Sequence, residues 1–355
     1  MRNNVKLLQE SMSDFCDCAI ITSDTNRRYL TGMKSTAGTV AVFRDRAYLI
    51  IDFRYIEKAR SIVTDCEVVL EQSLISQLGE LIKKHGAKTA AVEADSITLS
   101  HYNTLKNALP AEVTSGAELS DAISRLRRIK TDDEAEQIIK AQRIAERAFD
   151  EVRNFIRVGR TEREIALFLD YEMQKRSSEG VSFETIALSG ENTSMPHGVP
   201  GDRTVQDGDF VLMDYGAVVG GYHSDMTRTV AVGTPSDKMI SVYNTVLAAQ
   251  QAALAAAKAN ITGSELDAAA RNVITDAGYG DCFGHSLGHG VGLEIHEAPN
   301  ASPRCNKAIR EGAIVTVEPG IYIAGEFGVR IEDMVQVTKD GCKNLTLSEK
   351  QLIIL

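Results

Sequence analysis

The first third of the chain alternates between short apolar runs and segments with the spacing of an amphipathic helix. Runs of four or five apolar, β-branched residues are typical of buried strands, and apolar residues three and four positions apart are typical of helices. The alternation predicts an α/β domain with a mixed sheet. The expected strands cover residues 18–22, 39–43, 47–51 and 89–93, and the expected helices cover residues 55–63, 76–85 and 100–109.

A polar and basic segment over residues 122–131 interrupts this alternation. We place the domain boundary there, with residues 1–122 in the first domain and residues 123–355 in the second. A long helix is expected to follow as far as residue 156, capped by Thr131 or Asp132. Thr161 and Glu164 have the spacing of a capping box, which predicts a further helix that ends near residue 175.

After residue 180, short strand-like segments alternate with glycine-rich turns. Two helices are expected among them, one over residues 236–259 and one that starts at Ser264, with Asp267 completing its capping box, and stops before Gly278. The pattern predicts an α+β domain of antiparallel hairpins with helices on one side. The expected strands cover residues 210–214, 227–232, 313–317 and 329–337.

Length, charge and cysteine content narrow the class of protein. The chain has 355 residues, which suits two domains, and its formal net charge of -10 argues against a nucleic-acid-binding surface. None of the six cysteines forms a Cys-x-x-Cys pair, so we expect reduced thiols. The first residues lack the apolar core of a signal peptide, and no run reaches the roughly 18 apolar residues of a membrane span. We therefore expect a soluble, cytoplasmic protein.

Candidate chemistry gathers in the second domain, where five of the seven histidines fall between residues 197 and 296. The segment 211–229 reads as a hairpin that turns at Gly220 and Gly221. That turn would place Asp214 opposite Thr227 and would bring Asp225 onto the same face as Asp214. A metal ion shared by the two acids would offset the cost of burying them. The alternative is an ordinary surface turn rich in Asp and Gly.

A second segment, residues 284–297, holds three histidines among closely spaced glycines. The glycines disfavour a helix, and the segment lacks the His-Glu-x-x-His pattern of common zinc proteases. Such glycines indicate backbone packed tightly against a site, and the alternative is a flexible loop. Further on, Glu318 ends an apolar strand and Glu332 lies within another. Each of these two residues taken singly would fit a solvent-facing glutamate equally well.

Together the candidates comprise two Asp, two Glu and one His. An oxygen-rich set with one imidazole suits Mn²⁺, Fe²⁺, Co²⁺ or Zn²⁺. Four carboxylates balance the charge of two dications better than that of one. Two such ions could share a water molecule, lower its pKa and stabilise a tetrahedral intermediate.

In these motifs, residues 130–350 resemble the pita-bread metallopeptidases, which include methionine aminopeptidase, Xaa-Pro aminopeptidase and Xaa-Pro dipeptidase (prolidase). The N-terminal part resembles the creatinase-type, ribonuclease-H-like domain that precedes the catalytic domain in the proline-specific members. The resemblance implies an α+β pita-bread catalytic domain preceded by an α/β N-terminal domain. It also implies a homodimer and two divalent metal ions, with Mn²⁺ expected first and Co²⁺, Zn²⁺ or Fe²⁺ as alternatives.

The resemblance also assigns roles to individual residues. His197 and His296 resemble the family histidines that contact the substrate and act on the reacting group, and His285 resembles a supporting histidine near the substrate. Arg330 resembles a residue that orients a ligand carboxylate, and Glu318 would double as the proton shuttle. The implied metal ligands are Asp214, Asp225, His289, Glu318 and Glu332, with Asp225 and Glu332 bridging the two ions.

The main prediction is a proline-specific aminopeptidase, and the alternative is a prolidase. A dipeptidase must hold a free carboxylate, and prolidases often carry an Arg shortly after the second substrate histidine. This chain has Asn300 there, with Arg304 a few residues on, which weakens the dipeptidase interpretation. Two other classes stay open: a non-catalytic binding module on the same fold, and a metal-independent hydrolase resembling creatinase. The complete ligand set argues against both.

Overall fold

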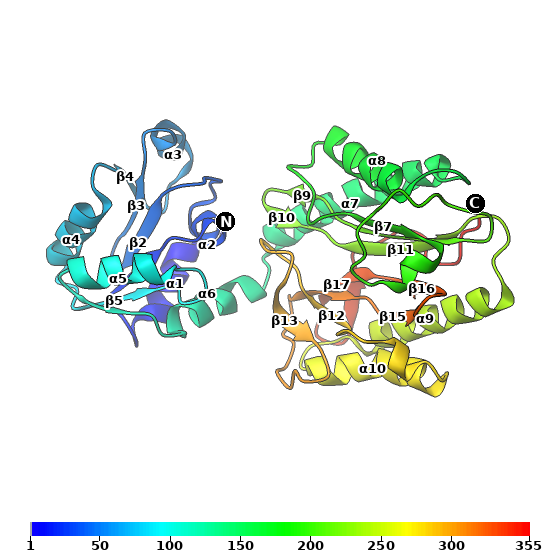
Figure 1. Cartoon of the computed structure of the whole chain (residues 1–355). Helices are drawn as coiled ribbons and strands as arrows, with labels where there is room; N and C mark the ends of the chain where they lie inside the picture. The colour runs from blue at the N-terminus through cyan, green and yellow to red at the C-terminus, as the bar shows by residue number, and fades with distance from the viewer. Residues whose placement is uncertain (1) are drawn as a thin grey trace. The chain divides into compact units, whose positions relative to one another are not determined.

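The computed structural model describes residues 2–355, and the chain forms two compact units. The first unit ends at Arg127, and the second runs from Arg128 to Leu355 (Figure 1). No helix among residues 2–355 has the length and apolar character that crossing a membrane requires.

The first unit is built on a mixed sheet, as the sequence predicts, and the sheet has six strands where four were predicted. Its middle strands pair antiparallel, and parallel pairs flank them on both sides. The strand order is β4-β3-β2-β1-β5-β6. The strands are β1 (Cys18–Ile21), β2 (Thr39–Phe43), β3 (Ala47–Ile51), β4 (Glu67–Leu70), β5 (Thr89–Val92) and β6 (Glu112–Thr114).

Six helices accompany this sheet, and α4 and α5 pack apolar side chains such as Leu78 and Leu105 against its strands. The sequence did not predict α1, α2 or α6. The last of these covers most of the segment expected to be a polar junction, because its buried residues lie on one face of an otherwise charged helix. The helices are α1 (Asn4–Met12), α2 (Asp24–Thr31), α3 (Ile56–Ile62), α4 (Leu74–His85), α5 (Leu99–Ala108) and α6 (Glu118–Arg128).

The second unit combines antiparallel sheets with four long helices. A three-stranded sheet has the order β11-β8-β7, and a five-stranded sheet has the order β13-β12-β14-β17-β18. The helices are α7 (Asp132–Phe155), α8 (Glu162–Lys175), α9 (Asp237–Ala256) and α10 (Gly263–Asp276). The strands are β7 (Ile186–Ser189), β8 (Phe210–Tyr215), β9 (Val218–Val219), β10 (Tyr222–His223), β11 (Met226–Ala231), β12 (Gly288–Gly290), β13 (Glu297–Ala301), β14 (Ile314–Val317), β15 (Gly320–Ile323), β16 (Phe327–Arg330), β17 (Asp333–Val337) and β18 (Cys342–Asn344).

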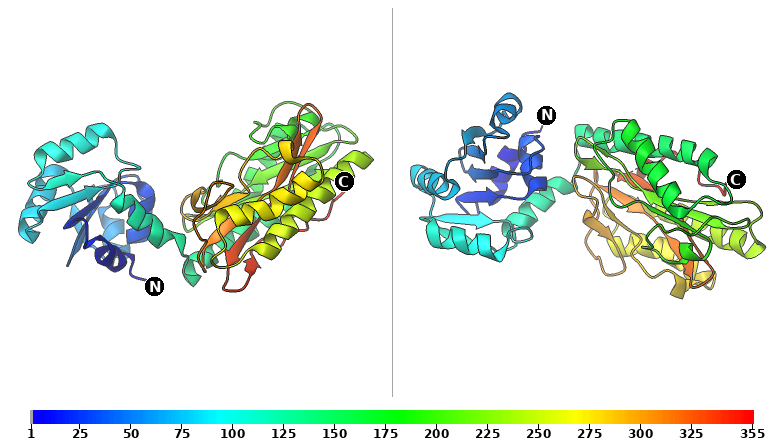
Figure 2. Two further views of the ribbon diagram at one scale, coloured as in Figure 1. Left: turned by 90° about the horizontal axis from the view of Figure 1, so that it is seen from below. Right: turned by 45° about the horizontal axis from the view of Figure 1, so that its top comes forward.

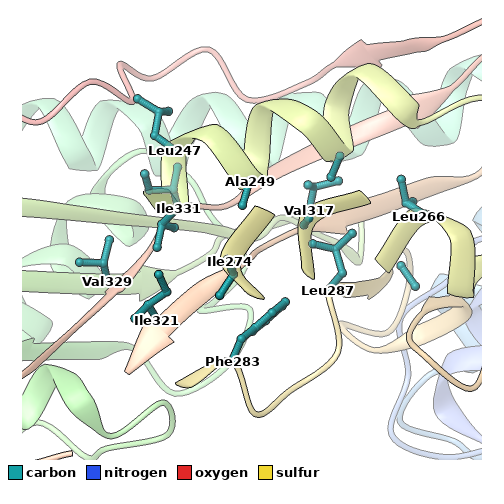
Figure 3. Packing of buried hydrophobic residues seen from close by; sticks show 14 of the residues in the cluster. Leu247, Ala249, Leu266, Ile274, Phe283, Leu287, Val317, Ile321, Val329 and Ile331 are labelled. Atoms are coloured by element: carbon teal, nitrogen blue, oxygen red, sulfur yellow. The ribbon is translucent and has the colours of Figure 1, made fainter. Parts of the chain in front are cut away.

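The helices of this unit lie on both sides of the sheets, so the prediction of helices on one side was wrong. Helices α7 and α8 pack on the β7-β8-β11 sheet, and α9 and α10 pack on the opposite side, as Figure 2 shows. Figure 3 shows the core beneath α9 and α10, where Leu247 lies beside Ile331 and the same cluster includes Leu266 and Val317. Helix α7 also packs on the five-stranded sheet, through Ala135 and Ile138 against Ile314 and Met334.

Side-chain caps fix where these helices begin. The capping boxes at Thr131 and Thr161 are present, which confirms the predicted starts of α7 and α8. The prediction for α10 was wrong, because Thr262 and not Ser264 caps it, with Glu265 completing the box. Asp267 is buried and instead accepts hydrogen bonds from Arg271 and from the amide of Leu287.

The predicted hairpin turn is present. Gly220 and Gly221 join β9 to β10, both with positive φ, as a two-residue turn of this kind requires. Asp214 pairs with Thr227 across β8 and β11, which confirms the predicted register. The expected single strand over residues 329–337 is instead two strands, because the chain leaves β16 before Glu332 and enters β17 after it.

A buried ionic network ties β11, β17 and the C-terminal segment together. Arg228 donates to Asp333 at 2.8 Å and also to the carbonyl of Glu332. Gln250 and Lys350 donate to the other oxygen of the same carboxylate. Burial acts to raise the pKa of Asp333, but the charges of Arg228 and Lys350 outweigh it and hold that pKa below its usual range.

Replacing Asp333 with Ala is expected to lower the free energy of unfolding by about 3 to 5 kcal/mol, because Arg228 would keep a buried charge without its partner. Urea denaturation of the full chain measures the change. Asp150→Ala is the matched control: Asp150 is exposed and pairs with Arg153 on α7, so that variant should lose about 1 kcal/mol or less. Equal losses in the two variants would contradict the role of the buried network.

Candidate active site

The β8–β11 hairpin supplies the first two acidic side chains. Asp214 is the fifth residue of β8, and Asp225 immediately precedes β11. Gly216 allows the two arms of the hairpin to approach closely here, because a Cβ at that position would lie 1.8 Å from the carbonyl oxygen of Ser224. Both carboxylates line one pocket, as the predicted register required.

His289 lies in the middle of β12, between two glycines. A Cβ at Gly288 would lie 2.1 Å from the carbonyl oxygen of Thr316, and one at Gly290 would lie 2.6 Å from backbone atoms of Ala298. The glycines therefore let β12 pack tightly between its neighbours. This confirms the interpretation of close backbone packing over that of a flexible loop.

Two glutamates lie just outside strands of the second unit. Glu318 comes directly after Val317, the last residue of β14, and its amide donates to the carbonyl of Leu287. Glu332 occupies the break between β16 and β17, and its carboxylate accepts a hydrogen bond from Thr227 at 2.7 Å. The side chain of Glu332 is buried, so the alternative of a solvent-facing glutamate is wrong for this residue.

The donor atoms of these residues converge. Single ligand atoms of Asp225, His289 and Glu332 all lie within 4.8 Å of one another. The Nε2 atom of His289 is 3.5 Å from Asp225 Oδ2 and 3.4 Å from Glu318 Oε1. Asp214 Oδ1 and Glu332 Oε1 are buried, and neither has a hydrogen-bond partner among residues 2–355. Buried carboxylate oxygens without donors are what a cation would satisfy.

Burial makes this cluster hold protons near neutral pH when no cation balances it. Burial raises the pKa of Asp225 and of Glu332 well above the usual range, and neighbouring carboxylates add to both shifts. Burial also raises the pKa of Glu318 to about 8, against the opposing charge of Arg330. The positive groups of the protein therefore do not balance the negative charge that these carboxylates would carry if ionised.

The tautomer of His289 is set by its neighbours. Its Nδ1 atom lies 3.1 Å from the carbonyl oxygen of Gly290, which can only accept, so Nδ1 carries the hydrogen. Burial lowers the pKa of the ring to about 4, and the nearby His296 adds to the shift, so His289 is neutral at pH 7. Its Nε2 lone pair thus points toward the carboxylates, as a metal-ligating imidazole requires.

A series of hydrogen bonds connects Asp214 of the cluster to Arg330, Tyr322 and His285. Arg330 donates to Asp214 Oδ2 at 2.6 Å and to the hydroxyl of Tyr322 at 2.8 Å. That hydroxyl lies 2.9 Å from His285 Nε2. Arg330 also donates to Thr227, the residue that holds Glu332. Sequence reasoning named Arg330 and His285 but missed Tyr322 and Thr227, because nothing in their spacing marks a neutral hydroxyl as part of a site.

All nine predicted site residues line one pocket of about 850 Å³. His197 and His296 are exposed at its surface, and the His296 ring lies 4.3 Å from the His289 ring in an edge-to-face arrangement. Asn300 also lines the pocket, whereas Arg304 is not among the described lining residues. The nine are Asp214, Asp225, His289, Glu318, Glu332, His197, His285, His296 and Arg330.

The pocket combines two kinds of surface. The carboxylate cluster lies beside apolar side chains such as Phe183, Ile186 and Ile295. The basic side chains among the described lining residues are Arg163 and Arg330, and Arg330 is buried against Asp214. Such a pocket can hold cations next to an apolar group, with histidines available to donate hydrogen bonds to a developing negative charge.

Comparisons with known proteins agree with this arrangement. Residues 136–339 match the family described as "Metallopeptidase family M24", and residues 5–129 match the family described as "Creatinase/Prolidase N-terminal domain". The chain is 41% identical to the uncharacterized peptidase YqhT of Bacillus subtilis (strain 168), over 96% of each chain. It resembles the solved Xaa-Pro dipeptidase from Bacillus anthracis, with a TM-score of 0.95 and 42% identity over 99% of each chain. It also resembles the X-Pro aminopeptidase from Thermotoga maritima MSB8, with a TM-score of 0.91 and 36% identity over 98% of this chain and 99% of that one.

Proposed function

The chain belongs to metallopeptidase family M24, and from that membership we propose that it hydrolyses the bond before proline in short peptides, removing a single N-terminal residue. It is a hydrolytic enzyme with the pita-bread fold of that family, preceded by an N-terminal domain of the creatinase/prolidase type. The proposed boundary between the two domains lies in residues 122–131.

The observation that carries the proposal is that carboxylate oxygens without hydrogen-bond partners and an imidazole nitrogen lie close together in the pocket. Asp214 Oδ1 and Glu332 Oε1 are buried without partners among residues 2–355, and the Nε2 lone pair of His289 faces Asp225 and Glu318. Two divalent cations fit this set of ligands, because four carboxylates would balance their charge and the neutral imidazole adds a nitrogen ligand. We propose all five residues as ligands, with Mn²⁺ expected first.

When bound, a pair of divalent cations lowers the pKa of water and polarises a carbonyl oxygen. The chain's own residues then perform the remaining steps. Glu318 accepts the proton of the attacking water and delivers it to the proline nitrogen, which leaves as an amine. His296 and His197 donate hydrogen bonds to the substrate, and His296 opposes the charge that develops on the carbonyl oxygen. Arg330 holds Asp214 in place through its bond to Oδ2.

The relatives and the pocket favour different substrate lengths. The Xaa-Pro dipeptidase from Bacillus anthracis supports a dipeptidase activity at 42% identity. The pocket supports an aminopeptidase, because Asn300 lines it where prolidases often carry an Arg. A neutral amide lacks the positive charge that would hold the free carboxylate of a dipeptide. The dipeptidase is the first candidate, since it follows the stronger overall similarity. The aminopeptidase is the second, and its support is Asn300 together with the likeness to the X-Pro aminopeptidase from Thermotoga maritima MSB8.

The matched pair Ala-Pro and Ala-Pro-Ala distinguishes the two candidates. If the chain is a dipeptidase, kcat/KM for the dipeptide should exceed that for the tripeptide by about tenfold or more, because only the dipeptide places its carboxylate next to the proline ring. Release of alanine is measured by chromatography after loading with Mn²⁺, Co²⁺ or Zn²⁺. Faster cleavage of the tripeptide would identify an aminopeptidase, and Ala-Ala-Ala serves as the control for proline specificity. Cleavage of none of the three would contradict the proposed function.

Three expectations from the sequence stay predictions. These are the identity of the metal, the homodimer and the cytoplasmic location. Metal analysis of the protein as isolated and its molar mass in solution address the first two.

A further inference from the structure

A buried ion pair lies next to the segment that carries His296. Lys130 Nζ donates to Glu297 Oε1 at 2.6 Å, and the two side chains are only 1% and 7% exposed. Lys130 is the third residue of the second unit, and its amide donates to the carbonyl of Gly312. Neither Lys130 nor Glu297 belongs to the described lining of the pocket, so neither is placed to touch the substrate.

The Glu297 carboxylate fills the inside of a turn formed by residues 292–297. The amide of Gly292 donates to the carbonyl of Glu294, and the amide of Glu294 lies 3.5 Å from Glu297 Oε2. A Cβ at Gly292 would lie 2.4 Å from Glu297 Oε1. The turn therefore closes around this carboxylate, and a side chain at its first position would require the carboxylate to move.

The same turn presents His296 to the pocket. Glu297 is the first residue of β13, and His296 directly precedes it in the chain. Glu297 points to Lys130, while Ile295 and His296 line the pocket. The His296 ring lies 4.3 Å from that of His289. A rearrangement of the backbone of this turn would thus move the His296 ring relative to the carboxylate cluster.

A buried ion pair is weak evidence for stability, because removing two charges from water costs about as much as their attraction returns. Its directional bonds nevertheless permit one arrangement of the turn. We propose that Lys130 and Glu297 are positioning residues that fix the 292–297 turn and so hold His296 where it acts on the substrate. The role of His296 in this inference rests on the proposed function.

The variant Lys130→Met tests the inference, because Met keeps most of the volume of the side chain without its charge. Its kcat/KM for the better Xaa-Pro substrate should fall about tenfold or more, mainly through kcat, since small displacements of a catalytic group have effects of that size. Lys130→Arg should retain most of the activity. The matched control is Lys140→Met, which removes an exposed lysine paired with Glu136 on α7 and should leave kcat unchanged.

A double-mutant cycle separates positioning from general support of the fold. If Lys130 acts through His296, then Lys130→Met should change kcat/KM less than about twofold in a His296→Ala background. A full additional loss in that background would overturn the inference. So would Lys130→Met with a lowered Tm but normal kcat/KM. If Lys130→Met does not fold, the isosteric Glu297→Gln carries the same cycle.

Crystal structures give a readout that does not depend on activity. The 292–297 turn should differ between the parent protein and Lys130→Met or Glu297→Gln, and an unchanged turn would overturn the inference. A parent protein that cleaves no Xaa-Pro peptide would contradict the proposed function, while the position of the turn would still decide whether the ion pair fixes it.

Discussion

Replacing Glu318 with Gln is expected to lower kcat by about 10³-fold or more while leaving the protein folded, because an amide cannot accept the proton of the attacking water. Gln has the shape of Glu and can still accept the hydrogen bond that Thr316 donates at 3.0 Å. The backbone bond from the Glu318 amide to Leu287 does not involve the side chain. The measurement is steady-state hydrolysis of an Xaa-Pro peptide, with Tm as the check on folding.

Two controls show whether a loss of activity in Glu318→Gln reflects lost proton transfer. Glu311→Gln makes the same chemical change at an exposed position in the same domain and should keep normal activity. Metal content shows how Glu318 acts: an inactive variant with normal metal content supports proton transfer, whereas loss of metal supports a ligand role. If the Glu318→Gln variant retains more than about a tenth of the parent kcat, the assignment of Glu318 as proton shuttle is wrong.

Removing divalent cations with a chelator is expected to reduce hydrolysis to about 1% or less of the loaded activity and to lower Tm, because ligand binding stabilises the folded state by about 2.7 kcal/mol at one hundred times its Kd. Adding back Mn²⁺, Co²⁺ or Zn²⁺ to the stripped protein should restore both properties. Full activity in a protein shown by mass spectrometry to lack metal would favour the metal-independent hydrolase instead. Absence of hydrolysis in both states would favour the non-catalytic module.

The stabilisation by metal should increase from pH 6 to pH 8. Burial raises the pKa of Glu318 to about 8, so the folded, metal-free chain holds a proton that the unfolded chain has already released. That raised pKa stabilises the metal-free fold at low pH, and the contribution is lost as the pH rises through about 8. Cations compete with the same proton and bind more tightly as it leaves. The Tm difference between loaded and stripped protein should therefore widen with pH, and a constant difference would contradict protonation of the cluster.

Local chemistry explains which parts of the fold could be predicted from the sequence. The turn at Gly220 and Gly221 and the register of Asp214 with Thr227 followed from two-residue turn geometry, and both were confirmed. The capping box at Thr161 was confirmed, and of the two caps predicted for α7 the structure has Thr131, since such caps depend on residues three positions apart. The box at α10 was misplaced by two residues because Ser264 and Thr262 offer the same hydroxyl chemistry.

Long-range packing explains most of what was missed. The break at Glu332 was not predicted, because the apolar residues on both sides of it continue a strand-like pattern. Only the tertiary structure shows that Glu332 is buried and accepts a hydrogen bond from Thr227. The helix α6 was missed because its charged composition resembles that of a linker. The proposed ligands in the pocket could be predicted because they lie in sequence motifs rich in acidic residues and histidines. Tyr322 is neutral, and only the tertiary structure shows that it joins Arg330 to His285.

The bonds of Arg330 also constrain how this chain can change over generations. One guanidinium holds Asp214, Thr227 and Tyr322 at once, and it is buried among them. A mutation that removed Asp214 alone would leave a buried cation unpaired, and one that removed Arg330 alone would leave a carboxylate with one donor fewer. A lineage that abandoned its metals would therefore have to pass through less stable intermediates or replace acid and base together. Such epistasis tends to preserve the whole set of residues, even in descendants whose substrates have diverged.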